Sequence, residues 1–159
     1  LVHKAKELQY HTKMINSGRY VNDSMGRYIG KKVVKKIISQ GKNILGAHVL
    51  VMGMTFKENV SDIRNSKVAD IINEFKDFGA EVDVMDPFAS PLEVLQEYGI
   101  RLVERPGKKY DAVVVAVAHT TYLKLDESYF MSITNEHAVL ADVKGVYRGS
   151  IHQMIYWSL

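Results

Sequence analysis

The sequence predicts an α/β fold: a doubly wound, mostly parallel, Rossmann-like sheet preceded by a long helix. Short apolar runs alternate with segments of helical periodicity, the order found in parallel sheets that helices cover on both faces. The apolar runs end in glycine or polar residues, as buried strands do where they leave a sheet. The 159 residues are enough for one core with a helical appendage, but not for two full-sized domains.

Residues 1–42 are predicted to be a helical segment with two helices. A short helix covers 2–15, with Ala5, Leu8 and Ile15 as apolar positions. A longer helix covers about 17–40 and ends at Gly41. The apolar side chains of the longer helix recur at helical spacing: Val21, Met25, Tyr28, Ile29, Val33, Ile37 and Ile38.

The longer helix is expected to reach beyond its own domain. Its length is about 36 Å at the usual rise, so part of its apolar face is expected to meet another domain or subunit. Gly26 and Gly30 share one face and permit a close helix crossing, or are simply two tolerated glycines. Its lysines are most simply a solvated face, because no aromatic platform for nucleic acid accompanies them: Lys31, Lys32, Lys35 and Lys36.

Residues 43–159 are predicted to be the α/β domain, and its first unit is a strand followed by a helix. The strand, over 48–53, is a short apolar run that ends in glycine. The helix has Ser66 as its N-cap and Gly79 as its C-terminal stop. Its apolar residues recur at helical spacing: Val68, Ile71, Ile72, Phe75 and Phe78.

Two further strand and helix units follow. A strand over 82–85 ends at Asp86, and Ser90 opens a capping box, with proline at the first helical position, for a helix that stops at Gly99. After a short strand around 101–103, residues 112–118 form the most buried strand. Asp126 can cap a short helix, and residues 138–142 form the last predicted strand. No pattern predicts the structure of 147–159.

The connection 54–66 is predicted to bind an anion. It carries Lys57 and Arg64 before a helix N-terminus, where free N–H groups and the helix dipole favour negative charge. It is not a dinucleotide fingerprint, which needs three glycines, nor a P-loop, which needs glycine where Phe56 stands. The simpler alternative is a pair of solvated charges on an exposed loop.

Polar residues after the other strands favour the anion site. Ligands of such sheets bind beyond the carboxyl ends of the strands, where the sequence places Asp86, His119 and Lys144. Asp86 stands where a ribose-binding acid would stand but is also an ordinary turn opener, and His119 is more simply a hydrogen-bonding residue than a general base. The six histidines show no metal-ligand spacing, and no Ser-His-Asp set or paired carboxylate follows from spacing.

Composition narrows the class of protein. A net charge of +3, with basic and acidic residues interspersed, gives little support for nucleic-acid binding. The absence of cysteine excludes a disulfide, a thiolate metal site and a cysteine nucleophile within this chain, and it fits a reduced cytoplasm. No apolar run approaches the length of a membrane span. Because the chain does not begin with methionine, we expect a fragment of a longer protein or a processed chain.

The connection and two further motifs resemble a known family. The motifs are Gly53-x-Thr-Phe-Lys57-Glu-Asn-x-x-Asp62-x-Arg64-Asn-Ser-Lys67, Arg19-x-x-Asn22-Asp23 on the long helix, and Asp86-Pro87. With them, nearly the whole chain resembles the C-terminal part of the UDP-glucose/GDP-mannose dehydrogenase family. The Thr-Phe-Lys-Glu-Asn form is most similar to the bacterial branch that acts on UDP-N-acetylhexosamines for capsule or O-antigen uronic acids.

The resemblance implies an NAD-dependent oxidation of a sugar C6 alcohol to a carboxylate, in two steps, through a cysteine that holds the sugar covalently. That cysteine and the NAD-binding domain lie before the segment seen here, so this chain holds no catalytic residue and is expected to be inactive alone. The chain resembles the central dimer helix and the UDP-sugar-binding domain, which implies a cytoplasmic homodimer.

By resemblance, Phe56 and Lys57 contact the nucleotide sugar, and Arg64 reaches the NAD held by the other domain. Lys144 is a third substrate-binding residue by resemblance, but it stands where many relatives have an arginine, and a lysine cannot make arginine's bidentate contact. One alternative is a stand-alone nucleotide-binding or regulatory module that dimerises through the long helix. A second is a nucleic-acid-binding helix on an α/β scaffold, which predicts steeply salt-dependent binding.

Overall fold

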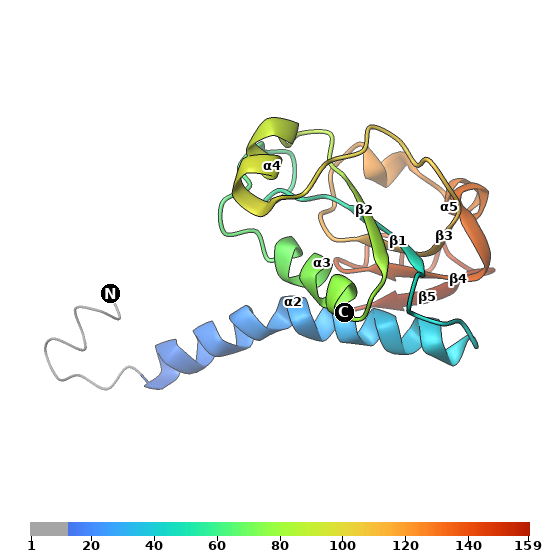
Figure 1. Cartoon of the computed structure of the whole chain (residues 1–159), viewed down its shortest axis with the longest axis horizontal. Coiled ribbons are helices and arrows are strands. Elements are labelled where there is room, and N and C mark those ends of the chain that lie inside the picture. Colours follow the sequence, from blue (N-terminus) through green and yellow to red (C-terminus); the bar gives the residue numbers. More distant parts are fainter. Residues whose placement is uncertain (1–12) are drawn as a thin grey trace, which may run out of the picture.

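In the part of the chain that the structure describes, five parallel strands form one sheet in the order β2-β1-β3-β4-β5. The structure is a computed structural model that describes residues 13–159, with side chains described for residue 18 and residues 20–159 (Figure 1). The strands are β1 (His48–Met52), β2 (Glu81–Met85), β3 (Tyr110–Val115), β4 (Thr134–Asp142) and β5 (Ile155–Ser158). The predicted α/β fold with a parallel sheet is confirmed. Most of the helix predicted over 2–15 lies outside the described residues.

Helices cover both faces of the sheet (Figure 1). Successive strand residues point to opposite faces, so Val49 and Val51 pack with α2 (Lys13–Ser39) and α3 (Val68–Asp77). Leu50 and Met52 pack on the other face with α5 (Glu127–Ile133) and the 3-10 helix η1 (Tyr122–Lys124). The remaining helix, α4 (Pro91–Tyr98), lies beyond the end of β2. Within residues 13–159, no helix is both long and apolar enough to cross a membrane.

Gly26 and Gly30 let α2 cross α3 at close range. A Cβ on Gly26 would lie 2.6 Å from the Cβ of Asp70, and a Cβ on Gly30 would lie 2.7 Å from the Cβ of Glu74. The predicted close crossing is therefore confirmed, and the second helix belongs to the same chain. From the crossing onward, α2 buries four apolar side chains in the core: Ile29, Val33, Val34 and Ile37. The division into 1–42 and 43–159 stays a prediction.

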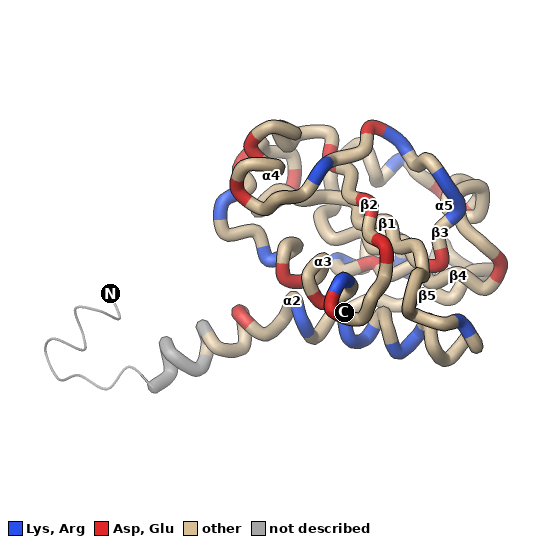
Figure 2. The backbone as a smooth tube through the Cα atoms, viewed as in Figure 1, with Lys and Arg blue, Asp and Glu red and all other residues tan. Residues whose placement is uncertain are grey.

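Four lysines of α2 lie along its C-terminal half (Figure 2): Lys31, Lys32, Lys35 and Lys36. The Nζ of Lys31 lies 3.9 Å from a carboxylate oxygen of Glu74, and the Nζ of Lys32 lies 5.2 Å from the centre of the Tyr28 ring. Both contacts lie within the surface of this chain. They agree with the prediction of a solvated face.

The predicted caps of the two later helices are confirmed. The hydroxyl of Ser90 accepts a hydrogen bond from the N–H of Glu93 at the start of α4, and Gly99 ends that helix in the left-handed conformation. The carboxylate of Asp126 accepts a hydrogen bond from the N–H of Tyr129 at 2.9 Å and starts α5.

Four predicted features need correction. The strand over 138–142 is not the last, because β5 follows it. The N-cap of α3 is Lys67, and Ser66 instead accepts from the Val68 N–H at 3.3 Å. The segment 101–103 forms a single bridge, from Leu102 to Val84, because it lies alongside β2 over one residue only. The strand predicted over 112–118 ends at Val115, since the chain leaves the sheet there toward the edge that carries the site.

Gly26→Ala is expected to lower the free energy of unfolding by about 1–3 kcal/mol, because the new methyl group meets the Cβ of Asp70 and the backbone oxygen of Lys67. Urea denaturation followed by the fluorescence of Trp157 measures the change. Gly18→Ala is the matched control, since a Cβ on Gly18 meets nothing within 4 Å. It should be neutral, or stabilising by up to about 1 kcal/mol. Equal effects of the two substitutions would contradict the close crossing.

Candidate functional site

A pocket of about 610 Å³ lies at the carboxyl ends of β1, β3 and β4, against α2 and the first turn of α3. It lies at the switch point of the sheet, because β1 leads through α3 to β2 on one side, while β3 pairs with β1 on the other. The connection 54–66, the end of β3 and the turn after β4 supply its lining, which includes Phe56, Lys57, Glu58, Ala116, Val117 and Lys144.

The connection 54–66 leaves β1 through a glycine that no other residue can replace without strain. Gly53 has φ +96°, and a Cβ on it would lie 2.5 Å from the Cβ of Val117. The connection then closes on itself, with the N–H of Phe56 donating to the carbonyl of Asp62 at 2.7 Å. This turn brings Phe56 and Lys57 to the pocket.

A buried carboxylate at the end of β2, Asp86, holds the start of this connection. Its Oδ2 accepts hydrogen bonds from the N–H groups of Met54 at 2.6 Å and Thr55 at 3.0 Å. Its Oδ1 accepts two more from the turn that follows β2. Burial by itself raises the pKa of Asp86, but hydrogen bonds from His119 and from these backbone N–H groups outweigh burial and hold the pKa well below its usual value.

His119 ties the end of β3 to the same carboxylate. Its Nε2 lies 3.0 Å from Asp86 Oδ2, and its Nδ1 accepts a hydrogen bond from the N–H of Asn59 at 2.9 Å. Since Nδ1 is an acceptor, the hydrogen-bond pattern assigns the neutral ring, with its proton on Nε2 and directed at Asp86. Asn59 is held again by its side chain, which accepts from Thr120 at 3.0 Å. The side chains of Asp86 and His119 are 0% exposed, so the pair holds the connection and does not face a ligand.

A second buried carboxylate, Asp142, fixes the turn that carries Lys144. It accepts hydrogen bonds from the N–H groups of Gly145 at 2.8 Å and Tyr147 at 2.7 Å, and from the hydroxyl of Tyr156 at 2.8 Å. The turn after β4 is therefore held on both sides of Lys144.

The structure brings three of the four predicted binding residues to one pocket. Phe56, Lys57 and Lys144 line it, and Phe56 is 60% exposed. Arg64 lies outside this pocket, with its side chain 80% exposed and its guanidinium paired with Asp62 through two hydrogen bonds of 2.9 Å. These hydrogen bonds lower the pKa of Asp62 to about 2.

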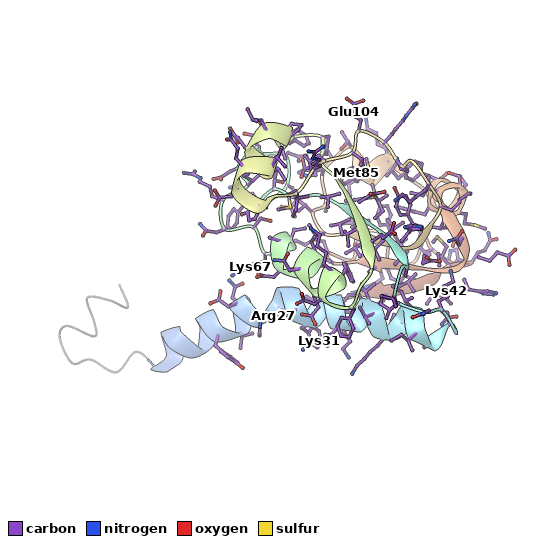
Figure 3. All side chains as sticks on the ribbon, in the orientation of Figure 1. Arg27, Lys31, Lys42, Lys67, Met85 and Glu104 are labelled. Carbon is purple, nitrogen blue, oxygen red and sulfur yellow. The ribbon has the colours of Figure 1, made fainter. Side chains whose placement is uncertain are left out.

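Reasoning from spacing did not predict that α2 forms one wall of the pocket. Asn22, Asp23 and Gly26 line it. Lys67, at the start of α3, donates to Asp23 at 2.8 Å and joins the two helices at the rim (Figure 3). The available signal was the Arg19-x-x-Asn22-Asp23 motif, which marks this part of the helix as more than a packing surface.

The arrangement is suited to holding an anion. Lys57, Lys67 and Lys144 line the pocket, whereas the carboxylates and the imidazole at the strand ends are already hydrogen-bonded. Over residues 13–159, no group of three or more His, Cys, Asp or Glu is placed to hold a metal ion. The fold and the pocket define a doubly wound α/β domain with a lysine-lined pocket at its switch point.

Comparison with known proteins gives the family. The model of the UDP-glucose/GDP-mannose dehydrogenase family, UDP binding domain, matches residues 50–149. The matched residues include the connection 54–66, all of β3 and the turn that carries Lys144. The chain belongs to this family, as its UDP binding domain.

Relatives and solved structures agree with this membership. The chain is 39% identical to the UDP-N-acetyl-D-glucosamine 6-dehydrogenase of Pseudomonas aeruginosa over 145 residues, which are 91% of this chain and 34% of the relative. It is 38% identical to Protein CapL of Staphylococcus aureus, over 92% of this chain and 34% of that protein. The NDP-N-acetyl-D-galactosaminuronic acid dehydrogenase of Methanosarcina mazei has the same fold, with a TM-score of 0.81 at 22% identity over 93% of this chain and 32% of that one. The chain spans about a third of the length of these proteins.

Asp86→Asn is expected to lower the free energy of unfolding by about 3 kcal/mol near neutral pH, because a buried ionised acceptor is replaced by a group with one acceptor and two donors. The difference from wild type should be complete above pH 3.8, the ordinary pKa of the group, and should shrink as the pH falls toward the lowered native pKa.

Urea denaturation at a series of pH values tests this expectation. Asp77→Asn is the matched control, because Asp77 is an exposed residue in the last turn of α3 and makes the same change of charge. A difference from wild type that stayed constant with pH would show that the ionised form of Asp86 is not what stabilises the connection.

Proposed function

We propose that this chain is the UDP-sugar-binding part of an NAD-dependent nucleotide-sugar 6-dehydrogenase, which oxidises a UDP-N-acetylhexosamine to its uronic acid for surface-polysaccharide synthesis. The observation that carries the proposal is the lysine-lined pocket at the switch point, built largely from segments within the match to the UDP binding domain. The substrate class is supported by two relatives of 39% and 37% identity, both UDP-N-acetyl-D-glucosamine 6-dehydrogenases.

Lys57 is the proposed first contact for the diphosphate. Among the described residues, no carboxylate forms an ion pair with its Nζ, although Asp62 lies near enough to feel its charge. Lys144 is the proposed second contact, from the turn after β4. A lysine acts as a compact point charge, so it can neutralise a phosphate without the planar geometry of an arginine. Phe56 offers an exposed apolar ring at the same pocket for the sugar or the base.

The oxidation is proposed to need residues outside this chain, which has no cysteine to hold a covalent intermediate. NAD would accept the hydride. Of the residues here, only Arg64 is proposed to contact NAD, because its side chain lies outside the pocket and is 80% exposed, although its guanidinium is paired with Asp62. The chain has no glycine-rich fingerprint to hold a dinucleotide by itself. A cytoplasmic location stays a prediction.

Titration of the 159-residue chain with UDP, followed by two-dimensional amide NMR, is expected to shift amides of the connection 54–66 and of the turn after β4. Lys57→Ala should weaken the binding about five-fold, which corresponds to about 1 kcal/mol for a partly exposed charged contact. Lys76→Ala is the matched control, since Lys76 is exposed on α3 and does not line the pocket.

Two further arms of the titration separate the alternatives. NAD alone should cause only weak shifts near Arg64. A short DNA duplex should leave the lysines of α2 unaffected at moderate salt. If UDP had no effect while DNA shifted the amides of α2, the proposed function would be wrong.

We also propose that the chain forms a homodimer through the N-terminal half of α2. This half extends past the α/β domain (Figure 1) and exposes Val21, and Tyr28 follows just past the middle of the helix. The two residues are 56% and 44% exposed and lie two turns apart on one face. An apolar face of this kind on a projecting helix is typical of a helix-to-helix interface.

Val21→Asp is expected to convert a dimer into a monomer, because it puts a charge in the apolar contact. Size-exclusion chromatography with light scattering measures the mass. Ile38→Asp is the control, since Ile38 is an equally exposed apolar residue of α2 on a different face, 51% exposed. A wild-type chain that stays monomeric at high concentration would contradict the proposal.

A further inference from the structure

Glu58 is an acid in a pocket that is otherwise suited to an anion. It follows Lys57 directly in the connection 54–66 and lines the same pocket. Its Oε1 lies 3.6 Å from the Nζ of Lys144, and the two side chains are 36% and 56% exposed. One of the two lysines assigned to the diphosphate is thus already paired with a carboxylate of this chain.

The ion pair between Glu58 and Lys144 bridges two segments whose backbones are fixed. Asn59, next to Glu58, is held by His119 and Thr120, and the turn of Lys144 is held by Asp142. The two segments follow β1 and β4, and β3 lies between these strands in the sheet.

The ion pair therefore crosses the crevice above the end of β3. Ala116 and Val117, which follow β3, line the pocket between its two ends. A ligand that approaches these residues from solvent meets the carboxylate of Glu58 and the ammonium of Lys144 together.

We propose that Glu58 is an internal competitor for the ligand: it occupies Lys144 in the empty pocket, and the diphosphate displaces it. This inference rests on the proposed function, because it assigns the diphosphate to this pocket. A partly exposed ion pair is weak enough for a diphosphate to replace it. Glu58 thus lowers the affinity of the pocket for diphosphates without contacting the ligand itself.

A weakened hold on the diphosphate is compatible with catalysis in a larger enzyme. Contacts that bind substrate, transition state and product equally well do not raise kcat. A carboxylate that competes for Lys144 also takes part in release, because it returns to the lysine as the diphosphate leaves.

Isothermal titration of the 159-residue chain with UDP, for wild type and Glu58→Gln, tests the proposal. Glu58→Gln is expected to bind UDP about two- to five-fold more tightly, the range that corresponds to an exposed ion pair. The gain should shrink at high salt. Glu104→Gln makes the same change of charge on an exposed loop that does not line the pocket, on the side of the molecule away from α2 (Figure 3), and should leave the affinity unchanged.

A double-mutant cycle separates competition for Lys144 from simple repulsion of the ligand. In a Lys144→Met background, Glu58→Gln should no longer tighten UDP binding. If the gain persisted there, Glu58 would act by repelling the phosphates directly, and the proposal would be wrong. Uridine, which has no phosphate, should bind both forms alike, and a gain for uridine would also overturn it.

The outcomes distinguish this proposal from the proposed function. If wild type binds UDP and Glu58→Gln binds it equally well or more weakly, only the role of Glu58 is refuted. If neither protein binds UDP, the assignment of the pocket to a diphosphate is refuted, and the role of Glu58 with it. Binding by Glu58→Gln alone would support both.

Discussion

The site depends on one buried carboxylate, that of Asp86. Where parallel strands end, the backbone leaves the sheet with N–H groups that need new partners. The carboxylate of Asp86 accepts hydrogen bonds from four such N–H groups, two in the connection after β1 and two in the turn after β2. Its fifth hydrogen bond comes from His119, after β3. Three strand ends are therefore fixed to one side chain. Through His119 the same network also holds Asn59, the residue beside Glu58.

The second constraint is the close crossing of α2 and α3. Gly26 has two roles: it lets the two helices approach closely, and it lines the pocket. The position of the pocket wall is thus set by helix packing, and the ion pair of Lys67 with Asp23 holds the rim of that wall. A change in the crossing would move Asn22 and Asp23 relative to the connection 54–66. Packing at a position with no functional group therefore shapes the site.

Local patterns in the sequence predicted the alternation of strands and helices, the caps at Ser90 and Asp126 and the strand ends where ligands bind. They did not predict β5, because it is a half-buried edge strand of four residues with no buried apolar run. Spacing gives Asp86 and His119 separate interpretations: Asp86 is a ribose-binding acid or a turn opener, and His119 is a hydrogen-bonding residue. Their pairing follows only from the strand order, which places β2 and β3 on either side of β1. The sequence also did not predict where the Arg64 side chain points, because its direction depends on a hydrogen-bonded pair with Asp62, two residues away.

The charges of the pocket show how binding and chemistry are divided. His119 uses both ring nitrogens in holding the connection, and Asp86 and Asp142 are occupied by backbone N–H groups, so none of them can move a proton to or from a ligand. Of the three lysines in the pocket, Lys67 is paired with Asp23 and Lys144 with Glu58. Lys57 is thus the cation that meets an incoming anion without first leaving a carboxylate, among the residues that the structure describes. Recognition would start at Lys57 and recruit Lys144 afterwards, while any redox step would be left to groups that this chain does not contain.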